Sequence, residues 1–265
     1  MPVDHYRMGL GLEPGITHVH KFGNNPVIAT TSDPEDIWDG GGIWLAPTAA
    51  RIHNIVSTSD VDGKTGSPSS AGARTLRVVG LTSWSTAEES EDITLDGTTN
   101  VPTVKSYVII HRMYVLTSGA TSANVGTITA TAVDDGTITA QIEATNGQTL
   151  MAIYGIPSGF TFFLGRLSAT IGKSGGSGAA ADIKLLYSPN PDTEETVFLV
   201  KSQFGLTTTG TSAFSVRFEP AAMTFVGPGI LKMRCKEVTA MLDVSATFDG
   251  TLINHVALAA AGKAP

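Results

Sequence analysis

The chain has 265 residues and is acidic, with 17 Lys and Arg against 24 Asp and Glu, which gives a formal net charge of -7. Charged residues make up only 15% of it, below the roughly 25% of an average globular protein, so Ser, Thr, Asn and Gly must solvate the surface. The acidic balance and the lack of a Lys/Arg cluster argue against direct nucleic-acid binding. No apolar run approaches the ~20 residues of a membrane span, and no secretory signal opens the chain, so we expect no membrane partner and assembly in a cytoplasm.

The first part of the chain, residues 1–47, differs from the remainder. It is rich in Gly and Pro and contains few sustained periodic runs, which predicts an extended N-terminal arm. Short alternating runs at residues 16–22 and 43–45 are β candidates within it. Because the arm has aromatic residues but little core of its own, we expect it to pack either on the body of the chain or on a neighbouring subunit. These aromatic residues are Phe22, Trp38 and Trp44.

Residues 48–156 form a series of short β-branched runs separated by turn residues, the pattern typical of sandwiches and barrels. A long polar stretch at residues 60–72 is predicted to be a loop. The clearest local signal is a hairpin, in which alternating runs at residues 126–133 and 137–142 flank the turn dipeptide Asp135-Gly136. The runs that indicate strands lie at residues 51–57, 74–81, 88–95, 99–104, 107–116, 126–133, 137–142 and 149–156.

A second β-rich half or domain is predicted over residues 157–255, and it is followed by a small, Ala-rich tail at residues 256–265. The strand pattern recurs at residues 160–171, 182–187, 196–204, 213–218, 231–234 and 238–248. The Gly-Ser tract at residues 172–178 is predicted to be a flexible loop. The pattern therefore predicts an all-β fold, an antiparallel and jelly-roll-like sandwich, built either as one unit or as two packed β-domains.

No constellation of residues indicates catalysis. Cys235 lies in an apolar run and is interpreted as a small buried hydrophobe. His18 and His20 face the same side of a predicted strand, but nothing else in the sequence supports a metal site there. Gly172-Lys173-Ser174 is not a phosphate-binding loop, because Leu167 stands where that motif needs glycine. We predict a non-enzymatic protein with no catalytic residues, no cofactor and no metal.

Several short motifs, in their order along residues 20–155, resemble those of a family of virion structural proteins in tailed bacteriophages. The motifs lie at residues 20–23, 37–42, 73–78, 93–98 and 124–130. The resemblance implies a β-sandwich component of the virion, repeated in symmetric copies, whose partners are itself and the major capsid protein or other virion proteins. It transfers no catalytic residue.

The favoured function is a capsid decoration or cement protein that stabilises the head through contacts between subunits. A tail, adaptor or fibre-base structural protein is the alternative, as is a host-glycan-binding module, which would need an exposed aromatic platform. The residues predicted to contact a partner are Phe22, Trp38, Trp44 and Trp84.

Overall fold

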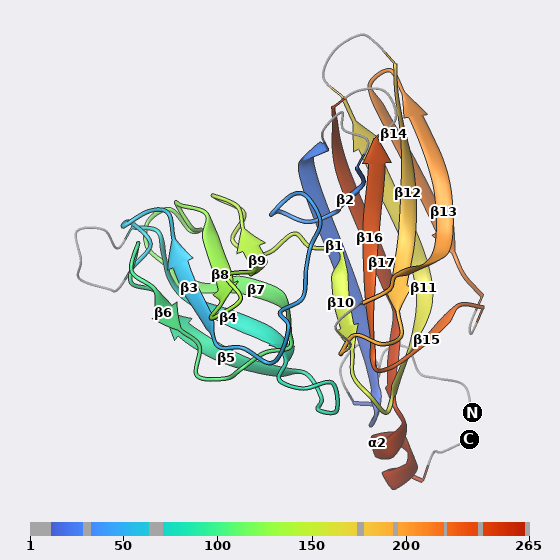
Figure 1. Ribbon diagram of the computed structural model, residues 1–265, viewed down its shortest axis with the longest axis horizontal. Coiled ribbons are helices and arrows are strands. Elements are labelled where there is room, and N and C mark those ends of the chain that lie inside the picture. The colour runs from blue at the N-terminus through green and yellow to red at the C-terminus, as the bar shows by residue number, and fades with distance from the viewer. Residues whose placement is uncertain are drawn as a thin grey trace.

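The structure is a computed structural model that describes residues 12–28, 33–63, 71–173, 178–192, 196–219, 222–237 and 241–262. It is nearly all β and consists of two sandwiches joined side by side, as Figure 1 shows. The predicted all-β antiparallel fold is thereby confirmed. Parts of the polar loop (residues 64–70), of the Gly-Ser loop (residues 174–177) and of the tail (residues 263–265) lie outside the described residues.

The larger sandwich has two antiparallel sheets. One has the strand order β1-β17-β11-β14 with the short β15 paired to β11, and the other has the order β10-β16-β12-β13 with the short β2 paired to β16. The first sheet comprises β1 (Ile16–Ile28), β11 (Phe160–Gly172), β14 (Thr211–Arg217), β15 (Thr224–Val226) and β17 (Leu242–Asn254). The second comprises β2 (Glu35–Asp36), β10 (Ile153–Ile156), β12 (Ala179–Ser188), β13 (Leu199–Thr208) and β16 (Gly229–Glu237).

The strand order of the larger sandwich is that of a jelly roll. With β2 and β15 left aside, its strands in chain order pair as 1-8-3-6 in one sheet and 2-7-4-5 in the other. This is the arrangement produced by a long antiparallel ribbon folded over on itself, and it gives the two interlocking Greek keys of that architecture. The register places Ile16 opposite Ile253, so the first and the last strand of the sandwich lie side by side.

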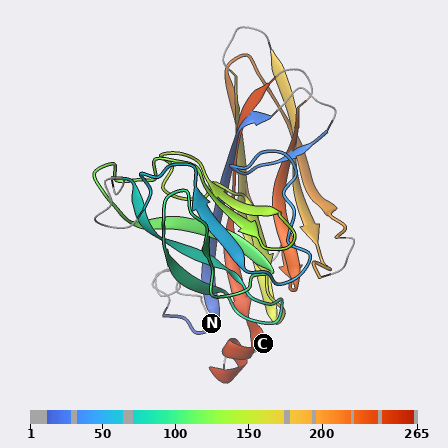
Figure 2. The ribbon, with the colours of Figure 1, turned by 60° about the vertical axis from the view of Figure 1, so that its left-hand side comes forward.

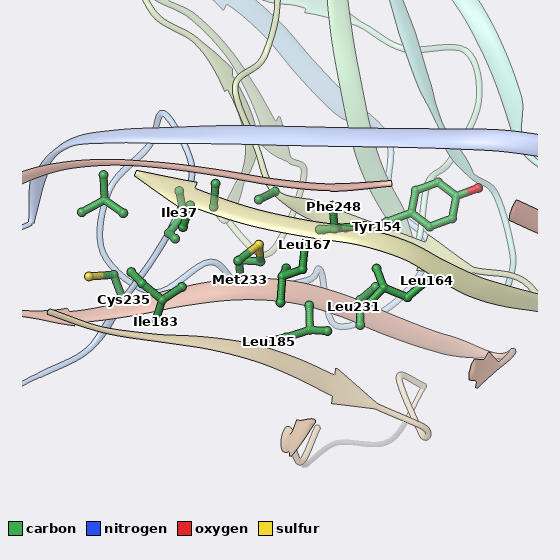
Figure 3. Close-up of a cluster of buried hydrophobic side chains, with 14 of the residues drawn as sticks. Ile37, Tyr154, Leu164, Leu167, Ile183, Leu185, Leu231, Met233, Cys235 and Phe248 are labelled. Carbon is green, nitrogen blue, oxygen red and sulfur yellow. The ribbon is translucent and has the colours of Figure 1, made fainter. Parts of the chain in front are cut away.

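The core of the jelly roll lies between its two sheets, as Figure 3 shows. Inward-facing residues alternate with outward-facing ones along β17, which carries Val244, Ala246 and Phe248 on its buried face. The ring of Phe248 lies edge-on to that of Phe162 on β11. Cys235 of β16 is buried in this core, which confirms the interpretation of its side chain as a small hydrophobe.

The smaller sandwich is inserted into the jelly roll between β2 and β10. Its sheets have the orders β6-β3-β8-β9 and β5-β4-β7. Its strands are β3 (His53–Ser57), β4 (Ala73–Leu81), β5 (Glu89–Thr94), β6 (Val101–Pro102), β7 (Ile109–Ser118), β8 (Ile128–Ala132) and β9 (Ile138–Ile142). The predicted hairpin is confirmed, because β8 pairs with β9 and Gly136 in the turn has a φ of 67°. Figure 2 shows the inserted sandwich in front of the jelly roll.

The first part of the chain differs from the predicted arm over residues 1–47. β1 pairs with β17 over its length and buries Val19 and Ile28 in the jelly-roll core. Of the two expected alternatives, the structure shows packing on the body of the chain. The division into residues 48–156 and 157–255 also differs, because β1 and β10 belong to the jelly roll while the inserted sandwich begins at β3 and ends with β9.

The described part of the chain has a short helix near its C-terminal limit, α2 (His255–Ala260), where the sequence pattern predicts only a small Ala-rich tail. The side chain of Asn254 caps it by accepting hydrogen bonds from the backbone N–H groups of Val256 and Ala257. An Asn before an Ala-rich run is a helix-start signal, so the helix could have been predicted.

Candidate interaction surface

The two edges of the jelly roll have different surroundings. At one edge, β1 and β10 face the inserted sandwich, and the turn after β10 is tied to it by a hydrogen bond from the Ser158 N–H to the Trp84 carbonyl oxygen. At the other edge, β13 and β14 lie on the side away from the inserted sandwich (Figure 1). One edge is therefore covered by the chain itself, and the other is open.

A buried ionic cluster fixes the covered edge. The Asp36 carboxylate lies 2.7 Å from Lys232 Nζ and 2.6 Å from Arg234 Nε, and it accepts a hydrogen bond from the Trp44 N–H. Asp36 and Lys232 are fully buried. Burial lowers the pKa of Lys232, and the charge and hydrogen bond of Asp36 oppose that shift. The cluster binds the segment leading to the inserted sandwich onto β16, because a buried cation requires a compensating anion.

The open edge carries exposed apolar side chains. Val197, Leu199 and Val200 are each about half exposed or more, and the only charged residue within residues 196–208 is Lys201. In the described residues β13 pairs only with β12, so its other side presents backbone N–H and C=O groups to the surroundings. Natural edge strands usually carry charges or prolines that block pairing with another chain. This edge has little such protection.

The open edge is nevertheless well ordered by its own core. Leu206 of β13 is buried in the jelly-roll core, and the rings of Phe204 on β13 and Phe214 on β14 are stacked with their centres 4.1 Å apart. The two edge strands are thus held together across the sandwich. The open edge, defined here as β13, is a preformed strand surface that a second chain could extend by antiparallel or parallel pairing. Phe198, directly before β13, belongs to the junction instead, because it packs against the core of the inserted sandwich.

The four residues predicted from sequence to contact a partner do not form this surface. Trp38 and Trp44 are buried at the junction between the sandwiches, and Trp44 Nε1 donates a hydrogen bond to the Thr139 carbonyl oxygen. Trp84 is partly buried against the inserted core, and Phe22 is partly buried beside the ring of His20. The predicted role is therefore corrected for Trp38 and Trp44, which are buried and join the two sandwiches. For Phe22 and Trp84, which are partly exposed, contact with a partner stays a prediction.

Sequence reasoning missed the apolar residues of the open edge, although a signal was present. The run from Val197 to Val200 contains no polar residue, whereas a strand with one solvated face alternates. The run was interpreted simply as part of a strand. Only the strand order shows that this strand lies at an edge, where Leu199 and Val200 stay exposed while Phe198 packs against the inserted sandwich.

Comparisons with known proteins identify no family. No family model matches the chain, and no curated protein matches it. Among solved structures, the chain is similar to one of the infectious bursal disease virus Gx strain, with a TM-score of 0.28 and 10% identity over 91% of this chain and 72% of that chain. The crystal structure of the VP2 subviral particle of that virus gives a TM-score of 0.15 and 10% identity, over 94% and 83% of the two chains. These TM-scores are too low to indicate a shared fold.

The histidine pair singled out from sequence faces outward from β1. His18 and His20 are both exposed, and burial of part of its ring lowers the pKa of His20. In the part of the chain that the structure describes, no group of three or more His, Cys, Asp or Glu residues is arranged to hold a metal ion. No helix among the described residues is both long and apolar enough to cross a membrane.

Proposed function

We propose that this chain is a structural protein of a virus particle, and more specifically a decoration or cement protein of a tailed-bacteriophage capsid. The observation that carries the proposal is the strand order of the larger sandwich. Jelly rolls with this order form viral capsid subunits, and also lectins and cupins, so the step from fold to function is an analogy. The resemblance of the sequence motifs to virion proteins favours the first of these uses.

The open edge supports a role in assembly. A protein that acts as a monomer gains nothing from an unprotected apolar edge strand, which invites association. A second copy of the chain is the proposed occupant, because the edge carries almost no charge and its backbone groups can pair with any strand. A symmetric homo-oligomer would bury these residues and would attach to the major capsid protein or to other virion proteins.

The inserted sandwich supports a position on the outside of a particle. It projects from the edge of the jelly roll opposite to the open edge (Figure 1), so it stays accessible when copies associate through β13. A projecting domain on an assembling base suits a decoration protein. The alternative virion positions, in the tail, the adaptor or the base of a fibre, share this geometry and differ in copy number.

Copy number per particle tests the proposal. Purified virions would be separated on a quantitative gel, with the major capsid protein as the internal standard. Hundreds of copies are expected for a decoration protein, and a dozen or fewer would place the protein on the tail. Absence of the chain from purified particles would reject a structural role. A matched measurement is the binding of the purified chain to capsids that lack it.

A further inference from the structure

A cavity of about 520 Å³ lies between the first strand of the jelly roll and the inserted sandwich. Residues of β1 line one side of it, and His111 and Arg112 of β7 together with Glu88 line the other. Its size falls within the range of small-molecule sites, and such sites are frequent at the junctions of domains. None of the assembly features described above involves this cavity.

Lys21 is the first residue that points to a ligand. Its side chain is 7% exposed, and its ammonium group donates a hydrogen bond to the carbonyl oxygen of His111. Among the described residues, no carboxylate oxygen lies within ion-pair distance of Lys21 Nζ. Burial and the charge of Arg112 lower the pKa of Lys21 to about 7, and the charge of Glu88 opposes that shift. A buried ammonium without a direct ion-pair partner is costly, and an anion in the cavity would supply that contact.

His111 is the second residue that points to a ligand. It is 2% exposed, and its Nε2 lies 2.7 Å from a carboxylate oxygen of Glu88. With Glu88 ionised, Nε2 carries the ring proton and donates a hydrogen bond to the Glu88 carboxylate, which leaves Nδ1 as a hydrogen-bond acceptor. Nδ1 is buried and has no hydrogen-bond partner among the described residues. A hydroxyl group is the kind of donor that such an acceptor needs.

The charged residues that line the cavity also favour an anionic ligand. Lys21 and Arg112 are the cations, and the only carboxylate among the lining residues, Glu88, is already bonded to His111. Arg112 is exposed on β7, and its guanidinium group lies over the Tyr114 ring at 4.9 Å from the ring centre. This contact orients the guanidinium group, which binds carboxylate and phosphate through paired N–H donors. The lining has an excess of positive charge and one unused acceptor.

We propose that this cavity binds a small hydroxylated anion, a sugar acid or a sugar phosphate. Lys21 and Arg112 hold the anionic group, and a ligand hydroxyl that displaces the side chains covering His111 Nδ1 donates a hydrogen bond to it. Glu88 fixes the tautomer of His111 that makes Nδ1 an acceptor. The proposal is independent of the virion role, because it concerns the junction of the two sandwiches within a single chain.

Isothermal titration calorimetry on the full chain tests the proposal with four probes. Glucuronate and glucose 6-phosphate carry the two anionic groups on the same sugar, glucose lacks the charge, and inorganic phosphate lacks the sugar. We expect one or both charged sugars to bind at least tenfold more tightly than glucose and than phosphate. The stronger of the two identifies the anionic group. Failure of both charged sugars to bind at millimolar concentration overturns the proposal.

Three variants assign the binding to the cavity. Lys21→Met and Arg112→Gln should each weaken binding of the charged sugar at least tenfold, while Lys184→Met, on the outward face of β12, should leave it unchanged. Thermal unfolding of Lys21→Met should occur at or above the wild-type temperature, because replacing an uncompensated buried charge with an apolar group removes a cost. Unchanged binding in both cavity variants overturns the proposal, and Arg112→Gln decides if Lys21→Met does not fold.

Discussion

Lys232 Nζ lies 2.7 Å from the Asp36 carboxylate, and neither side chain reaches the surface. The pair joins the segment that leads into the inserted sandwich to a central strand of the jelly roll. The ammonium group also lies 4.0 Å from the centre of the Phe198 ring, so an aromatic face shares in its stabilisation. The junction between the sandwiches is therefore held by charge as well as by apolar contact.

Replacement of Asp36 by Asn should strongly destabilise the protein. It leaves Lys232 and Arg234 without their anion, and removal of one partner of a buried ion pair typically costs about 3–5 kcal/mol. Urea unfolding followed by circular dichroism measures the loss. The matched control is Asp92→Asn, which breaks the exposed pair with Arg77 and should change stability little. Equal effects of the two substitutions would contradict a special role for Asp36.

A charged residue on the open edge should prevent self-association. In the double variant Leu199→Lys and Val200→Lys, a second copy that paired with β13 would have to bury two ammonium groups. We expect a larger species for the wild type and a smaller one for the variant by size-exclusion chromatography with light scattering. Val104→Lys is the control, because Val104 is even more exposed to solvent than Leu199 and Val200 but belongs to the inserted sandwich. A wild type that stays monomeric at high concentration would argue against the open edge as an interface.

Deletion of residues 1–28 should abolish the fold of the jelly roll. β1 pairs with β17 over its whole length, and its loss would expose β17 and the core residues beneath Val19 and Ile28. Circular dichroism and thermal unfolding should show loss of β signal and of the cooperative transition. Truncation after His255, which keeps the hydrogen bonds of that residue to Gly159 and Thr161 and removes the remainder of a helix without buried residues, should leave the melting temperature nearly unchanged. A folded deletion variant would restore the interpretation of this segment as a peripheral arm.

Gly23→Ala should destabilise the contact of β1 with the segment that leads to the inserted sandwich, through steric overlap. A Cβ at position 23 would overlap the Ile37 carbonyl oxygen and the Ala152 backbone nitrogen, neither of which can rotate away. Insertion of a methyl group into such a packed site typically costs about 1–3 kcal/mol. Gly172→Ala is the control, because a Cβ there meets its nearest neighbour at 4.0 Å. Equal stability of the two variants in urea would contradict this account of Gly23.

Acid should destabilise the inserted sandwich through His53. Burial lowers the pKa of His53 from 6.5 to about 4, and a hydrogen bond to the Arg51 carbonyl oxygen opposes the shift. The unfolded chain then binds more protons than the folded chain between these values, so stability is lost as the pH falls from 6.5 to 4, by up to about 3 kcal/mol. His53→Gln should show a smaller loss of unfolding free energy between pH 7 and pH 4.5.

Asp39 should change the free energy of unfolding with pH in the opposite direction to His53 over the same pH range. Burial raises its pKa from 3.8 to about 7, so its contribution is present below pH 3.8 and is lost as the pH rises towards 7. Compared with the wild type, Asp39→Asn should therefore lose more stability on acidification, and His53→Gln should lose less. The same pH slope in both variants would refute the assignment of either group.

Local patterns predicted most of the strands and could not predict how they associate. Alternation along residues 160–171 and the Asp135-Gly136 turn involve neighbouring residues, so the sequence shows them directly. The pairing of Ile16 with Ile253 depends on the whole chain between them, and composition favoured an extended arm instead. Asp62 shows the same limit: in a stretch predicted as a polar loop, it is fully buried and accepts hydrogen bonds from the N–H groups of Ala73, Val125 and Gly126.

The cavity could not be predicted from the sequence for a related reason. Lys21 and His111 are 90 positions apart and belong to different sandwiches, so no motif spacing connects them. A lysine at an alternate position of a strand normally marks the solvated face. The sequence pattern therefore singles out His18 and His20 in this strand as candidate site residues, but not Lys21. Only the placement of the inserted sandwich over β1 makes this lysine a buried one.

The separation of β1 from β17 along the chain also sets an order of events during synthesis. A ribosome that adds roughly 5–20 residues per second releases β17 on the order of 10–50 s after β1. The inserted sandwich consists of a continuous stretch from β3 to β9 and can fold within that time. The pairing of β1 with β17 would then be completed only after the last strand has been released.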